Sequence, residues 1–82
     1  MENIFRSDDI QLCSFLLTQG IRFIDVVESH PHHFIFTLSD AEKCTELKRQ
    51  FLNNAAAPVR DLFAEREMLI SEIKNKERSR NL

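Results

Sequence analysis

Three histidines lie close together near the middle of the chain, at His30, His32 and His33. Neutral imidazole is a common ligand of Zn²⁺, so this segment is the first place to look for a metal site. A zinc site needs three or four ligands that converge, whereas His32 and His33 point to opposite faces if the segment is a strand. Pro31 also stiffens the segment, and neither cysteine of the chain has a second cysteine two residues away. We therefore expect a solvated turn and no specific metal site.

Cys13 and Cys44 are the two residues that could act as thiol nucleophiles. Each falls on the apolar side of an expected helix, where a cysteine behaves as a small buried hydrophobic residue. A catalytic thiol needs instead a lowered pKa, an opening to solvent and a nearby base. The adjacent acids Asp8 and Asp9 suggest acid–base or magnesium chemistry, but their place at a helix start explains them by capping and by the helix dipole. We predict no catalytic residue and no cofactor.

Length and composition predict one small folded domain. The chain has 82 residues, of which 43% are hydrophobic, with seven Phe, enough for a single core. The single glycine argues against a phosphate-binding loop, which needs several. No segment approaches the roughly 20 apolar residues that span a bilayer, and no signal peptide is evident. We therefore expect a cytoplasmic protein with reduced cysteines and no evident small-molecule ligand.

Charge is unevenly distributed along the chain. Residues 1–73 carry seven Lys/Arg against twelve Asp/Glu, and residues 74–82 carry four against one. We interpret residues 1–73 as a single α+β domain and residues 74–82 as a basic, frayed tail. The residues of this tail that could contact phosphates are Lys74, Lys76, Arg78 and Arg80. Because no aromatic residue lies among them to stack on a base, a nucleic-acid-associated accessory factor is the alternative hypothesis and not the leading one.

Capping signals predict three helices. The first begins after the hydroxyl of Ser7, and Gly20 is a typical left-handed stop. The second begins with a capping box in which Ser39 is the cap and Glu42 follows three residues on. The third begins at Pro58, because proline suits the first position of a helix.

Between the first two helices, residues rich in β-branched and aromatic types predict a hairpin with strands 21–28 and 33–38. The sequence also allows a third strand at 3–6. The order is then β-α-β-β-α-α, an α+β fold in which three helices pack on a small antiparallel sheet. We expect strand 33–38 in the middle, because the most apolar strand is best kept away from a solvent edge.

The helices carry more apolar surface than such a small sheet needs. The first helix is apolar around most of its circumference, and the last has apolar residues near heptad spacing at Val59, Leu62, Leu69 and Ile73. Small domains often cover such surface in a twofold interface, although both helices could instead pack fully on the sheet. The leading hypothesis is therefore a small non-catalytic interaction protein that forms a homodimer or binds another protein.

A set of short motifs extends over residues 4–73. They are Phe5-Arg6-Ser7-Asp8-Asp9, Leu16-Leu17-Thr18-Gln19-Gly20, the Phe-Ile-Phe strand followed by Asp40, Phe51-Leu52-Asn53, and Pro58-Val59-Arg60-Asp61-Leu62-Phe63. In these motifs the chain resembles a family of small uncharacterised bacterial proteins, a domain of unknown function that is often encoded in phage-like or mobile regions. The family has no assigned catalytic residues, so the resemblance implies a fold and no activity. The histidine-rich hairpin loop and the basic tail depart from the family pattern.

Overall fold

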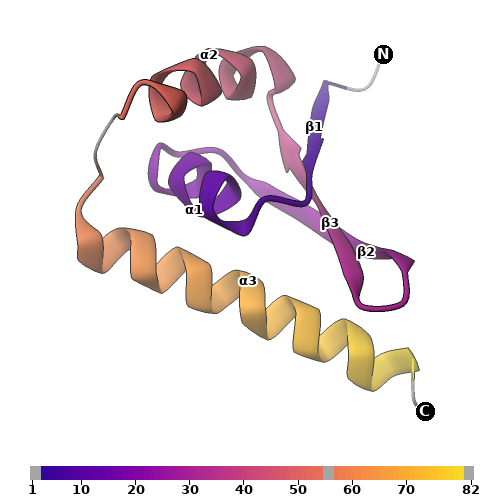
Figure 1. Cartoon of the computed structure of the whole chain (residues 1–82). Coiled ribbons are helices and arrows are strands. Elements are labelled where there is room, and N and C mark those ends of the chain that lie inside the picture. Colours follow the sequence, from indigo (N-terminus) through magenta and orange to yellow (C-terminus); the bar gives the residue numbers. More distant parts are fainter. Residues whose placement is uncertain (1–2, 55–56, 81–82) are drawn as a thin grey trace.

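Three strands and three helices follow one another in the order β-α-β-β-α-α in the computed structural model, which describes residues 3–54 and 57–80 (Figure 1). The elements are β1 (Ile4–Ser7), α1 (Ile10–Thr18), β2 (Phe23–His30), β3 (His33–Ser39), α2 (Ala41–Leu52) and α3 (Val59–Arg80). This confirms the α+β fold expected from the sequence, including the third strand, which begins one residue later than expected.

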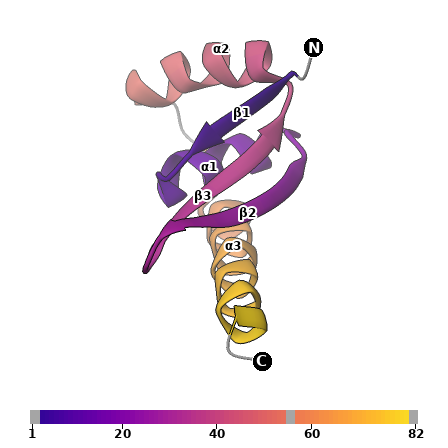
Figure 2. The same ribbon diagram turned by 90° about the vertical axis from the view of Figure 1, so that its right-hand side faces the viewer.

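The sheet has the order β1-β3-β2, and both pairings are antiparallel. The apolar strand β3 is therefore central, as expected. Phe36 and Leu38 point into the core, and Val26 lies opposite Phe36 on β2. Figure 2 shows α1 and α3 behind the sheet, so these two helices lie on one of its faces. No helix of the described residues covers the other face, where Val27 is 42% exposed.

Helix α1 lies at the centre of the molecule, and its side chains from Leu12 to Leu17 are all buried. It ends in a Schellman motif: the N–H of Gly20 donates to the carbonyl of Leu17 at 3.1 Å, and that of Ile21 to Leu16 at 3.2 Å. Gly20 has φ 94°, a left-handed conformation that glycine adopts without strain. The glycine stop predicted from the sequence is confirmed.

The N-cap of α1 is Asp9, and the prediction that Ser7 caps this helix is wrong. The Asp9 carboxylate accepts the N–H groups of Gln11 and Leu12 at 3.0 and 3.1 Å. The Ser7 hydroxyl instead accepts the N–H of Asp9 at 3.1 Å. Ser7 is the last residue of β1, so its hydroxyl holds the bend between the strand and the helix.

Helix α2 begins in the same way, one residue after the expected cap. Asp40 is the N-cap, with φ 59°, and its carboxylate accepts the N–H of Lys43 at 3.3 Å. Ser39, the expected cap, accepts the N–H of Arg22 at 3.1 Å and thereby ties the end of β3 to the start of β2. Because the Ser39 hydroxyl already accepts the N–H of Arg22, the carboxylate of the next residue, Asp40, caps the helix.

The hairpin turn is tighter than the sequence suggested, because β2 continues to His30 and only Pro31 and His32 connect the strands. His32 has φ 64°, a left-handed conformation common in two-residue turns. Its N–H donates to the carboxylate of Glu28 at 3.0 Å, which stabilises the turn without glycine.

Helix α3 packs on α1 and on β2 and continues to Arg80, past the boundary expected at Ile73. Residues 74–80 therefore continue the helix in the segment where the sequence predicted a frayed tail. This part of the helix contacts the hairpin: Lys76 Nζ is 3.8 Å from Asp25, and Glu77 is 3.8 Å from His32. Residues 81–82, at the end of the expected tail, and residues 55–56, between α2 and α3, lie outside the described residues.

Candidate functional site

The two cysteines are free and fully buried, on α1 and α2. Burial raises the pKa of the Cys13 thiol to about 12, and the negative charge of nearby Asp9 acts in the same direction. Burial also raises the pKa of Cys44, whose thiol donates to the carbonyl of Ser39 at 3.2 Å. Both thiols are therefore protonated and enclosed at neutral pH, which is the opposite of what nucleophilic catalysis requires.

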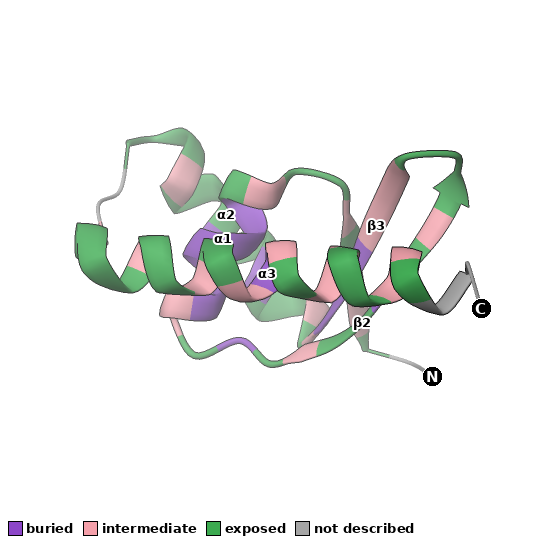
Figure 3. Ribbon diagram, turned by 90° about the horizontal axis from the view of Figure 1, so that it is seen from below, coloured by how far each residue is buried: buried purple, intermediate pink, exposed green. Residues whose placement is uncertain are grey.

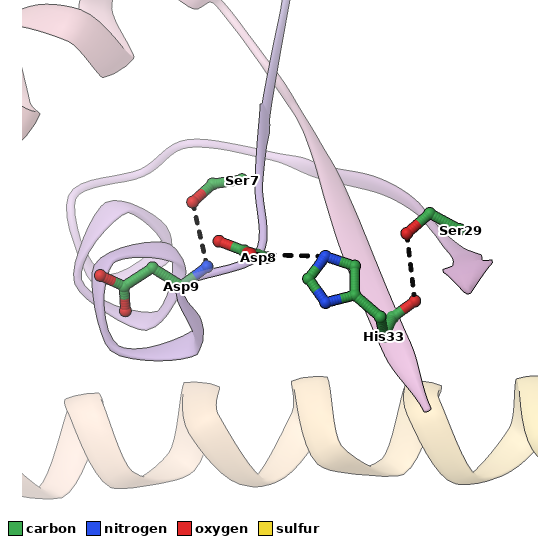
Figure 4. Close-up of polar contacts among 5 residues, drawn as sticks. All are labelled: Ser7, Asp8, Asp9, Ser29 and His33. Atoms are coloured by element: carbon green, nitrogen blue, oxygen red, sulfur yellow. Dashed lines mark hydrogen bonds and ion pairs between the residues drawn. The ribbon is translucent and has the colours of Figure 1, made fainter. Parts of the chain in front are cut away.

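The histidines of the turn serve as contacts between elements. His33 Nε2 lies 3.4 Å from the carboxylate of Asp8, which precedes α1 (Figure 4). His32 Nδ1 lies 3.8 Å from Glu77 on α3, and the ring of His30 is 5.7 Å from that of His33. Within residues 3–54 and 57–80, no group of three or more His, Cys, Asp or Glu side chains is placed to hold a metal ion. The turn thus bridges to α1 and α3.

An open cavity of about 290 Å³ lies beneath this turn. It is lined by Asp8, Ile10, His32, His33, Phe34, Phe36 and Ile73. Its walls are mainly apolar, and its polar groups are the paired Asp8 and His33 and the exposed His32. Small-molecule sites are usually larger and have polar groups aimed at the ligand. Because Asp8 and His33 lie against each other, this cavity offers little to orient a ligand.

The residues that the heptad pattern assigned to self-association lie mostly in the interior. Leu69 is fully buried in the core, and Leu62 and Ile73 pack against it. Val59, at the start of α3, is 80% exposed. Three of the four side chains therefore stabilise the single chain, and the surface available for a partner has to be sought on the opposite side of the helix.

That opposite side is an exposed stripe along α3, which we call the outer face. It consists of Arg60, Phe63, Glu67, Ile70, Ser71, Lys74 and Arg78, which follow the three- and four-residue spacing of one helix face. Phe63 is 60% exposed, and Ile70 is half-buried. Figure 3 looks onto this side of the molecule, and no other described element lies in front of α3. The outer face is thus the longest uncovered helix surface with apolar side chains.

The residues predicted to contact phosphates do not form one patch. Lys74 and Arg78 are exposed on the outer face, whereas Lys76 is directed toward β2 by its contact with Asp25. Arg80 is the last residue of α3, and its side chain is outside the described part of the structure. Two of the four basic side chains therefore share a surface, and they share it with Glu67.

No protein-family model, curated protein or solved structure matches the chain. The resemblance seen in residues 4–73 accordingly stays a prediction. No helix in the described ranges is long and apolar enough to cross a membrane. The function has to be argued from the surface of the molecule, where the outer face of α3 is the most distinctive feature.

Proposed function

We propose that this chain is a small non-catalytic interaction protein that self-associates through the outer face of α3. The observation that carries the proposal is Phe63, which is 60% exposed on a helix whose other side already packs on the core. Val59, one turn earlier, is 80% exposed and extends the apolar surface. Grouped large apolar side chains are typical of protein interfaces, where aromatic residues contribute much of the binding energy.

The chemistry-bearing side chains support a role without catalysis. Cys13 and Cys44 are buried with raised pKa values, and Asp9 caps α1. Asp8 and His33 contact each other across the junction of β1 and the hairpin. Each of these groups therefore has a structural role. We place the protein in the cytoplasm, where two thiols left unpaired are the normal state.

The sheet offers a less suitable surface for association. At the free edge of β2, the N–H of Val26 bonds to the Asp25 carboxylate at 2.8 Å, and the strand has irregular register near both ends. Charged residues and bulges of this kind prevent edge strands from pairing with another chain. The uncovered sheet face has Val27, but exposed Arg6 interrupts its apolar surface, and the Asp25 carboxylate on the same strand as Val27 lies 3.8 Å from Lys76 of α3. The outer face of α3 is therefore preferred.

Binding of nucleic acid remains the alternative, with Lys74 and Arg78 as its phosphate contacts. We favour a protein partner because Lys76 lies against Asp25 and because the acidic Glu67 lies on the outer face between the exposed cations Arg60 and Lys74. An acidic neighbour weakens the attraction of a basic patch for phosphates.

Light scattering coupled to size exclusion, from low to high micromolar concentration, tests self-association. We expect the wild-type chain to shift from monomer toward dimer, and Phe63→Gln to remain monomeric. Val27→Gln is the matched control, because it also removes an exposed apolar side chain but lies on the uncovered face of the sheet. A wild-type chain that stays monomeric throughout would refute the proposal, and loss of the dimer only in Val27→Gln would move the interface to the sheet.

A further inference from the structure

The charges along α3 are segregated. Residues 59–73 contain two basic and four acidic side chains, whereas residues 74–80 contain four basic and one acidic. A parallel partner helix of the same sequence would place like charges side by side. An antiparallel one would place the acidic part of each helix against the basic part of the other, and the helix dipoles also favour this orientation.

The charges on the outer face are complementary to those on the outer face of a second, antiparallel copy. If the twofold axis passes between positions 70 and 71, residues equally distant from the axis lie opposite each other. Glu67 of one copy then faces Lys74 of the other, and the symmetry makes this contact twice. Both side chains are exposed in the single chain, so neither has to leave an existing buried contact.

The apolar residues of the face fit the same arrangement. The two Ile70 side chains meet beside the axis, and the half-buried state of Ile70 in the single chain leaves part of its surface to be covered. Phe63 lies opposite Arg78 of the partner, where a guanidinium can stack on the phenyl ring. The arrangement thus covers the exposed aromatic ring that supports the proposed function.

The extent of this contact sets the expected affinity. In this register nearly the whole of α3 overlaps with its partner, over about 30 Å of helix. One helix against another buries less than the roughly 800 Å² per partner of a standard interface. Association in the micromolar range is therefore expected.

We infer that the partner on the outer face is a second copy of this chain, with the two α3 helices antiparallel and Glu67 of each opposite Lys74 of the other. This inference rests on the proposed self-association and adds its orientation and register. A shorter overlap, with Arg60 opposite Glu67, would also pair opposite charges. It would leave Ile70, Lys74 and Arg78 outside the overlap, so the longer overlap, which covers nearly the whole of α3, buries more of the outer face.

Charge reversal tests the register. We expect Glu67→Lys and Lys74→Glu each to raise the dimer dissociation constant by about tenfold, since each places two symmetry-related pairs of like charge in contact. The double variant Glu67→Lys/Lys74→Glu should return close to the wild-type value, because it recreates both pairs with the charges exchanged. If the double variant Arg60→Glu/Glu67→Lys returns the dissociation constant to the wild-type value and Glu67→Lys/Lys74→Glu does not, the shorter overlap is correct and the inference is overturned.

Cross-linking tests the orientation independently. Ser71 lies beside the expected axis, so Ser71→Cys should form a disulfide with its own copy under mild oxidation. Ala64→Cys is the matched control: it is also exposed on α3, but an antiparallel pair separates the two copies of this residue by about 20 Å. The native thiols are buried and should not react. Efficient cross-linking of both variants would indicate a parallel pair and refute the inference.

The two proposals fail in different ways. If the wild-type chain dimerises but neither charge exchange nor Ser71→Cys behaves as expected, the orientation is wrong and self-association still holds. If the wild-type chain is monomeric at high micromolar concentration, the proposed function fails and the inference falls with it.

Discussion

Asp8 and Asp9 are adjacent and chemically identical, but the backbone gives them different roles. Asp9 is placed so that its carboxylate accepts two N–H groups at the start of α1, whereas Asp8 is directed at His33. The sequence indicates that acids belong at this helix start. It cannot indicate which of them is the cap, because that depends on how β1 bends into α1 at Ser7.

The two acids should therefore differ in their contribution to stability. We expect Asp9→Ala to lower the free energy of unfolding by about 1 kcal/mol, since two N–H groups lose their acceptor. Asp8→Ala removes an exposed contact with His33 and should change it by less than about 0.5 kcal/mol. Urea denaturation at neutral pH measures the free energy of unfolding of both variants. An equal decrease in the two would show that Asp9 is not the main N-cap of α1.

The buried thiol of Cys13 makes stability depend on alkaline pH. Its pKa is about 12 in the folded chain and 9.0 ordinarily, so above pH 9 the unfolded chain loses a proton that the folded chain keeps. The free energy of unfolding should therefore fall as pH rises, by about 1.4 kcal/mol per pH unit from this group. Denaturation at about pH 8 and about pH 10 measures this change. Between these two pH values the free energy of unfolding should fall less in Cys13→Ala than in the wild-type chain. An unchanged slope would contradict the assignment.

At the scale of elements, the sequence predicted the helices and strands but not which side of α3 faces the core. Leu62 and Leu69 are each followed directly by a second large apolar residue, Phe63 and Ile70. Adjacent positions on a helix differ in direction by about 100°, so two apolar stripes run side by side. Only packing against α1 and β2 decides that the stripe with Leu69 is buried and that Phe63 remains at the surface.

This difference between the stripes can be measured as stability. Leu69→Ala should lower the free energy of unfolding by about 2–5 kcal/mol, because it leaves a cavity in the core. Phe63→Ala should lower the stability of the monomer by less than about 1 kcal/mol, because its ring is mostly exposed. Chemical denaturation at low protein concentration makes this comparison. A larger loss for Phe63→Ala would mean that the orientation of α3 is reversed.

The strand ends show a second limit of sequence reading. The pattern predicted the hairpin, yet β2 begins and ends two residues later than strand 21–28. Irregular register near Phe23 and near His30 accounts for the difference, since each bulge inserts a residue that the alternation does not reveal. The two-residue turn depends on the left-handed conformation of His32, which also cannot be predicted from the residue type.

For the whole molecule, self-association links stability to concentration. If only folded chains associate through the outer face, dimer formation favours the folded state. The Tm of the wild-type chain should therefore rise with protein concentration, whereas that of Phe63→Gln should stay constant. Calorimetry over a hundredfold range of protein concentration, centred at about micromolar values, would detect the rise in Tm that micromolar association predicts. Parallel behaviour of the two proteins would argue against an interface at Phe63.

The candidate surface was partly foreseeable at this scale. Surplus apolar helix surface and the excess of cations after residue 73 are both evident in the sequence. Their combination on one uncovered face is not, because it requires knowing that α3 continues as a helix to Arg80 and that its other side is occupied.

The short strand β1 has a further consequence for handling of the protein. Its four residues cover one side of β3, and Asn3 just before it binds the first N–H groups of α2, through its carbonyl to Asp40 and its side chain to Ala41. A tag or truncation that displaces β1 would expose the backbone of Phe36 and Leu38 as an unprotected edge. Such apolar edges recruit identical strands into insoluble cross-β aggregates, so additions to this chain are better placed at its C-terminus.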